Sequence, residues 1–170
     1  MVFSSCNIVR HKNPSVILKF SRFISIGDQI SLIRRITAED VKEFAKLTGD
    51  LNPIHIDAEY SKQTRYGRCI VHGTFVQGLV SCLLGVHFPG TGCVAYAISC
   101  RFPEALFVDE TCRIEAVVSK LRGRLATFDV NAYACERNAM VLAGHFDVFL
   151  TREQLSMKPP VNREIVCSSK

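Results

Sequence analysis

The stretch that decides the fold is GTFVQGLVSCLLGVHF, residues 73–88. Apolar side chains recur there at helical spacing in two neighbouring rows, so the pattern predicts one helix about 24 Å long, at 1.5 Å per residue. Pro89 and Gly90 end it. A helix that is apolar over most of its circumference has to be surrounded by other structure. A third row holds small or polar residues: Gly73, Gln77, Ser81 and Gly85.

The pattern changes after residue 92 to long apolar runs that are typical of β-strands. The runs cover residues 93–102, 111–121, 125–135 and 140–150. Short turns at residues 122–124 and 136–138 join the last three, which predicts an antiparallel meander. One long central helix with an antiparallel sheet wrapped around it is an α+β layout, and the shape is that of a single hot-dog fold.

The segment before the long helix predicts a strand, a helix and a polar loop. Residues 29–36 alternate as a half-buried strand does. Thr37 and Asp40 form a capping-type start for a helix that ends at Gly49. A loop over residues 50–57, stiffened by Pro53, then leads to a short helix near residues 58–63 that Asp57 caps.

The composition predicts one globular domain with a basic leader. The chain has 170 residues, 48% hydrophobic and 22% charged, and no 18-residue apolar run that would indicate a membrane span. Residues 1–27 contain four Lys or Arg, several serines and no Asp or Glu, which is typical of a mitochondrial transit peptide. A frayed N-terminal arm is the alternative. The domain is expected over residues 28–156, followed by a flexible tail over residues 157–170.

The eight cysteines include no CxxC pair, so the sequence predicts neither a metal site nor a disulfide framework. Most of them stand in apolar stretches, where a free thiol acts as a small hydrophobic group. Reduced, buried thiols suit a mitochondrial matrix or a cytosol.

The polar loop carries the residues best suited to chemistry. Asp50 and His55 lie five residues apart across Pro53, and a carboxylate with an imidazole suits a reaction that removes one proton and delivers another. The alternative is that Asp50 only caps a turn and His55 is a surface histidine. His72 is interpreted as a local hydrogen-bonding residue before the long helix rather than as a catalytic group.

The loop belongs to a longer pattern made of Phe44-x-x-Leu47-Thr48-Gly49-Asp50-x-Asn52-Pro53-Ile54-His55, Ser61, Ile70-Val71-His72-Gly73, Arg101-Phe102-Pro103 and Phe107-Val108. This pattern resembles the signature of the MaoC-like, (R)-specific enoyl-thioester hydratase family, over about residues 29–152. The resemblance implies that Asp50 and His55 are catalytic and that Asn52 holds the loop. It further implies that the Gly73 amide faces the thioester oxygen and that Ser81 lies near the substrate pocket.

With the predicted leader, this resemblance implies reversible dehydration of (3R)-hydroxyacyl thioesters, on acyl carrier protein or CoA, in mitochondrial type II fatty acid synthesis. It implies no cofactor, no metal and a homodimer. Arg65 and Arg68 either contact phosphates of the carrier or belong to a solvated loop. Acyl-chain length, the natural carrier, the division of proton transfer between Asp50 and His55 and the leader's cleavage site stay open.

Two rival readings remain at the level of sequence. A hot-dog thioesterase would release free thiol, and the spacing of Asp50, Asn52 and His55 speaks against it. A non-catalytic subunit that binds acyl thioesters or nucleic acid is the other. Nucleic acid is disfavoured because the chain outside the leader is nearly neutral and lacks alternating aromatic and basic residues.

Overall fold

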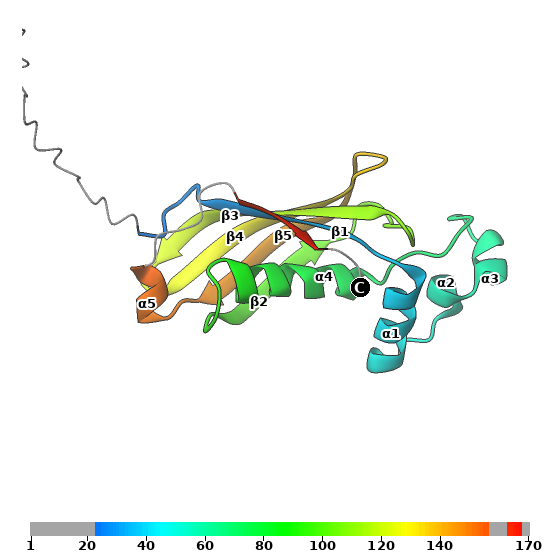
Figure 1. Cartoon of the computed structure of the whole chain (residues 1–170), viewed down its shortest axis with the longest axis horizontal. Helices are drawn as coiled ribbons and strands as arrows, with labels where there is room; N and C mark the ends of the chain where they lie inside the picture. The colour runs from blue at the N-terminus through cyan, green and yellow to red at the C-terminus, as the bar shows by residue number, and fades with distance from the viewer. Residues whose placement is uncertain (1–22, 157–162, 168–170) are drawn as a thin grey trace, which may run out of the picture.

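The computed structural model describes residues 23–156 and 163–167 (Figure 1). Most of the predicted leader, residues 1–22, and residues 157–162 and 168–170 of the predicted tail lie outside the described residues. The elements in chain order are β1 (Gln29–Arg35), α1 (Ala38–Thr48), α2 (Pro53–Ile56), α3 (Ala58–Lys62), α4 (Gly73–Cys82), a π-helical turn η1 (Leu83–His87), β2 (Val94–Arg101), β3 (Thr111–Arg122), β4 (Leu125–Ala134), β5 (Ala139–Phe149), α5 (Arg152–Leu155) and β6 (Arg163–Cys167).

One six-stranded sheet has the order β2-β5-β4-β3-β1-β6. β3, β4 and β5 form the predicted antiparallel meander, with β2 antiparallel to β5 and β1 antiparallel to β3. β6 alone runs parallel to its neighbour, β1. The α4 helix lies along one face of this sheet, with α1, α2 and α3 gathered near one end of it and α5 near the other (Figure 1). The predicted α+β layout is confirmed.

The core lies between α4 and the sheet. Alternate residues of β3, β4 and β5 face the helix because successive side chains of a strand point to opposite sides. Val80 and Leu83 are fully buried against them, whereas Gly78, Cys82 and Val86 on the other side of the helix are exposed. The sequence predicted a helix surrounded by other structure. In the described part of the chain, only one side of α4 is shielded from solvent.

Helix α1 is positioned by the capping box that the sequence predicted. The Thr37 hydroxyl accepts the Asp40 N–H at 3.2 Å, and the Asp40 carboxylate accepts the Thr37 N–H at 2.9 Å. At the other end Gly49 has φ +78°, in the left-handed region that glycine adopts without a steric penalty. The chain therefore turns sharply just before Asp50.

Three local expectations need correction. The loop over residues 50–57 contains α2, since Pro53 suits the first helical position and the Asn52 side chain accepts the Ile54 N–H. The long helix ends in a π turn over residues 83–87, where the Phe88 N–H bonds to Leu83 O. Residues 163–167, expected in a flexible tail, form β6 because β1 offers them an open sheet edge.

The folded body begins before the predicted boundary at residue 28. Ile24 is buried in the core, and the Gly27 N–H bonds to Val118 O at 2.8 Å. The last residues assigned to the leader thus belong to the domain. Among the described helices, none has the length and apolar character needed to cross a membrane.

Candidate active site

Asp50 stands at the end of α1 with its carboxylate half exposed. Its own N–H bonds to the Thr48 hydroxyl, and its carboxylate accepts the Asn52 N–H, both at 3.3 Å. Asn52 in turn caps α2, the helix that carries His55. Local hydrogen bonds therefore hold the loop, as expected for Asn52, while the outer part of the Asp50 carboxylate stays open to solvent.

His55 is fixed by a contact with the segment just before α4. Its Nδ1 lies 2.8 Å from Ile70 O. Because a carbonyl oxygen only accepts, Nδ1 carries a proton, and in the neutral ring Nε2 is the basic nitrogen. Ile70 thus selects the tautomer that leaves Nε2 available to a substrate.

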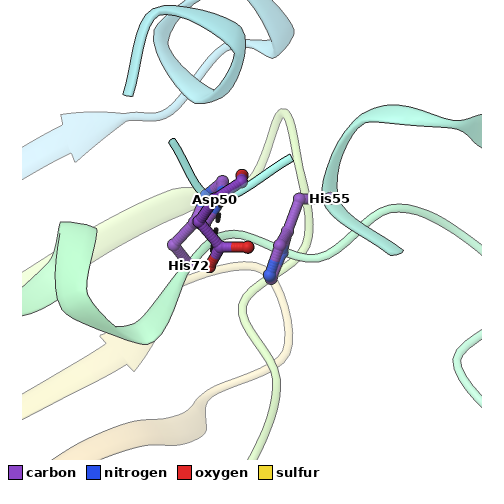
Figure 2. Close-up of side chains that lie close together, drawn as sticks. All are labelled: Asp50, His55 and His72. Carbon is purple, nitrogen blue, oxygen red and sulfur yellow. Dashed lines mark hydrogen bonds and ion pairs between the residues drawn. The ribbon is translucent and has the colours of Figure 1, made fainter. Parts of the chain in front are cut away.

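His72 is buried and lies close to Asp50 (Figure 2). Its Nε2–H donates to Asp50 O at 3.2 Å, and Nε2 lies 3.9 Å from Asp50 Oδ2. Its ring stacks on His55, with centroids 3.7 Å apart and planes at 25°. Burial lowers the pKa of His72, although the hydrogen bond to Asp50 O opposes that shift. His72 is therefore neutral near pH 7, and it packs against the His55 ring.

These side chains open into a cleft of about 730 Å³, a size suited to a small-molecule site. Gly73 lies on its wall at the start of α4, where the first N–H groups of a helix have no intrahelical partner. A Cβ on Gly73 would lie 2.8 Å from Phe102 Cζ, so this position admits no side chain without a shift of the ring. The other lining residues are Arg65, Tyr66, Ile70, Val71, Thr74, Val76, Pro103, Glu104, Ala105, Leu106, Phe107 and Val141.

The structure brings together most of the predicted site residues. Asp50, His55, Gly73 and Arg65 all line the cleft. Arg65 is exposed, donates to the Tyr66 hydroxyl at 2.7 Å and packs over that ring. Ser81 lies away from this group, in a separate small cavity further along α4.

The family model described as "MaoC like domain" matches residues 24–137, which include the whole cluster. The chain belongs to the MaoC-like domain family. The predicted family is confirmed.

Named relatives of this MaoC-like chain are hydro-lyases. It is 35% identical over 99 residues to the (R)-specific enoyl-CoA hydratase of Aeromonas caviae, covering 58% of this chain and 74% of the relative. It is 27% identical over 168 residues to the mitochondrial 3-hydroxyacyl-[acyl-carrier-protein] dehydratase FERN of Solanum lycopersicum, covering 98% and 97%. The predicted enzyme class, a hydro-lyase of the dehydratase and hydratase type, is confirmed.

The solved structure of the A. caviae (R)-hydratase involved in PHA biosynthesis superposes with a TM-score of 0.73 at 32% identity. The match covers 75% of this chain and 98% of that chain. This likeness confirms the predicted hot-dog fold.

The MaoC-like domain has a second ionisable cluster that the sequence did not reveal. The buried Glu110 carboxylate binds Arg68 at 2.7 Å and Arg137 at 2.8 Å, and it accepts the Phe107 N–H at 3.0 Å. Burial alone would raise the pKa of Glu110, but the Arg137 and Phe107 hydrogen bonds outweigh it and lower the pKa overall. Arg68 also packs over the Phe107 ring, so its guanidinium is engaged within the protein.

Asp50, His55 and His72 also offer one potential ligand atom each, all within 4.8 Å of one another. Two imidazoles and a carboxylate are a donor set that a zinc ion accepts. The prediction that the enzyme uses no metal stays a prediction.

Proposed function

We propose that this enzyme interconverts (3R)-hydroxyacyl thioesters and trans-2-enoyl thioesters, with Asp50 and His55 as its catalytic residues. The observation that carries the proposal is the convergence of the Asp50 carboxylate and the His55 ring on one cleft wall beside the start of α4. The hydratase and dehydratase relatives support the reaction class.

Two proton transfers make up the dehydration. His55 Nε2 removes the proton from C2, and protonated Asp50 donates its proton to the hydroxyl that leaves C3 as water. The pair ends with the proton on His55 and a charged Asp50. Hydration runs the same steps in reverse: Asp50 takes a proton from water as it attacks C3, and His55 returns the proton to C2.

Removal of the C2 proton places negative charge on the thioester oxygen. The N–H groups at the start of α4 stabilise that charge through hydrogen bonding and the positive end of the helix dipole. Gly73 suits this role because it has no side chain between its N–H and the cleft. The buried, neutral His72 positions Asp50 through the bond to its carbonyl oxygen.

The carrier of the acyl group is proposed to be acyl carrier protein or CoA, both of which end in a phosphopantetheine arm. Arg65 suits a phosphate of that arm, since it lines the cleft and is exposed. Arg68 is a weaker candidate, because its guanidinium already binds Glu110.

A role in mitochondrial fatty acid synthesis, in the matrix, is the finer part of this proposal. It is supported by the basic, acid-free leader and by two relatives whose names place them in mitochondria. Since Ile24 is buried in the domain, we expect the leader to be removed before that residue. Import of the full chain into isolated mitochondria, with N-terminal sequencing of the product, tests both points.

A homodimer through β2 is also proposed. β2 is an edge strand, and Val94, Tyr96 and Ile98 on it are exposed large hydrophobic residues. Pairing with a second β2 would cover an edge that otherwise invites aggregation. Analytical ultracentrifugation checks the mass in solution.

The decisive experiment follows loss of enoyl absorbance when the domain, from residue 23 onward, meets trans-2-enoyl-CoA, with a parallel assay for free thiol. Formation of the (3R)-hydroxy product without thiol release supports the proposal. Thiol release would indicate a thioesterase, and no turnover of either kind would indicate a binding subunit.

A further inference from the structure

The α4 helix and strand β2 run past each other and contact at successive levels. At the first level the Phe102 ring, just beyond β2, packs against Gly73. At the second level the Gln77 amide donates to Cys100 Sγ at 2.8 Å. Further along, residues of both elements line one small cavity. The Gln77–Cys100 contact is therefore the middle level.

A cavity lies on each side of that contact. The catalytic cleft is lined by Gly73, Thr74 and Val76 of α4 and by Phe102. The second cavity, of about 50 Å³, is lined mainly by small and apolar residues, and neither Gln77 nor Cys100 lines either space. Its walls are Ser81, Leu84, Gly85, Cys93, Ala95, Ile98, Phe146 and Val148.

The Gln77–Cys100 contact forms a barrier between the two cavities, and the sheet fixes the position of Cys100 in it. Cys100 pairs with Gly144 of β5, where a Cβ would lie 2.6 Å from Cys100 Cα. The missing side chain lets β2 approach β5 closely at this point. The hydrogen bond from Gln77 is easier to break than the pairing of Cys100 with Gly144, because a thiol sulfur is a weak acceptor.

We infer that Gln77 limits the length of acyl chain that the enzyme accepts. The inference rests on the proposed function, which places the thioester oxygen at the start of α4. The carrier leaves through the exposed side near Arg65, so the acyl chain extends toward the apolar wall at Val76. The Gln77 amide lies one helical turn beyond Gly73, between the cleft and the small cavity.

A short acyl chain fits in front of this amide without disturbing it. A longer chain has to displace Gln77 from Cys100 and leave the amide without its partner in a half-buried site. Beyond it lies the small cavity, whose helical wall runs from Ser81 to Gly85, about 6 Å at 1.5 Å per residue. Shortening the side chain joins the two cavities and admits the longer substrate.

The test compares kcat/KM for trans-2-decenoyl-CoA with kcat/KM for crotonyl-CoA. We expect wild type to favour crotonyl-CoA and Gln77→Ala to raise the decenoyl-to-crotonyl ratio about tenfold or more, within the range that a few methylenes produce in an apolar pocket. Gln77→Met is the matched control, since it keeps the length of the side chain and removes only the bond to Cys100, so its ratio should rise less than that of Gln77→Ala.

A second substitution tests the route beyond the barrier. A Cβ on Gly85 meets no atom within 4 Å, so leucine can be accommodated there and reduces the free space of the small cavity. Gly85→Leu should leave the ratio of wild type unchanged and cancel the gain of Gln77→Ala.

Three results would overturn the inference: equal use of both substrates by wild type, an unchanged ratio in Gln77→Ala, or the same rise in Gln77→Met. Each leaves crotonyl-CoA hydration intact. Failure of every protein to hydrate crotonyl-CoA would instead refute the proposed function.

Discussion

Two ionisable clusters, one lining the cleft and one packed against Phe107 in its wall, differ in how completely their charges are paired. The Glu110 carboxylate is buried and receives bonds from Arg68, Arg137 and the Phe107 backbone. The Asp50 carboxylate is half exposed; it accepts one backbone N–H, from Asn52, and lies 3.9 Å from His72 Nε2. One cluster has its charges satisfied by the fold, whereas the other leaves the Asp50 carboxylate half open to solvent and substrate.

This difference indicates that the Glu110 cluster has a structural role, whereas Asp50 and His55 are suited to react. A buried carboxylate between two guanidinium groups is stabilised in its charged form and has little capacity to exchange a proton during turnover. It fastens the segment that carries Phe102 and Phe107 along the cleft. Asp50 and His55, in contrast, are positioned through backbone contacts, so their reactive atoms are available to a substrate.

The largest effect should come from Asp50→Asn. An asparagine amide cannot take the proton from the attacking water, so kcat should fall by about 10²- to 10⁴-fold without unfolding of the domain. The measurement is the initial rate of enoyl-CoA hydration. Asp57→Asn is the matched control, because Asp57 caps α3 outside the cleft and asparagine also caps well. Near-wild-type activity of Asp50→Asn would show that Asp50 is not a reactive group, and the contrast with Glu110 would then fail.

Glu110→Gln should act on stability instead. It leaves Arg68 and Arg137 without their counter-charge and should cost about 2–3 kcal/mol of unfolding free energy, measured by urea denaturation. Activity per folded molecule should change less than about threefold, well below the range for a positioned acid or base. Asp109→Asn is the control, since its pair with Arg35 is exposed and worth at most about 0.5 kcal/mol.

Glu110 should also contribute to the way the free energy of unfolding depends on pH under acidic conditions. The pKa of Glu110 is lowered below its ordinary 4.5 in the folded protein, so its contribution is present above that pH and is lost as pH falls toward the folded value. Wild type should therefore lose stability below about pH 4.5 more steeply than Glu110→Gln. Parallel curves would show that Glu110 is not specially stabilised in its charged form.

His72 should give a smaller effect, of about two- to tenfold in kcat, the size of one hydrogen bond. His72→Phe keeps a ring against His55 and removes the donor to Asp50 O, while His72→Gln keeps a donor and removes the ring. Recovery of kcat in the glutamine variant, with KM unchanged, would show that the bond to Asp50 matters. Equal losses in both would favour a role in packing alone.

The smallest effect is expected for Arg65→Ala. A two- to fivefold rise in KM for the CoA substrate, with kcat unchanged and a weaker dependence on salt, fits one exposed contact with phosphate. Lys62→Ala, which removes another exposed cation beyond the cleft lining, is the control. An unchanged KM in Arg65→Ala would show that Arg65 does not contact the carrier.

Local patterns in the sequence predicted what depends on neighbouring residues. The capping box at Thr37 and the strands of the meander follow from such patterns, and Pro53 sets the short path between Asp50 and His55. The Glu110–Arg137 pair was missed because it depends on how the turn after β4 returns to the start of β3. The stacking of His72 on His55 joins two separate segments. β6 depends on its pairing with β1, which lies far away in the sequence.

The central claim is that Asp50 and His55 transfer the two protons. Incubation of a (3R)-hydroxyacyl-CoA in D2O, with wild type, Asp50→Asn and His55→Gln, measures deuterium incorporation at C2 alongside enoyl formation. Wild type should show both, and each variant should lose both by at least about 100-fold. Incorporation of deuterium at C2 by His55→Gln at the wild-type rate would contradict the account, because another group would then be moving that proton.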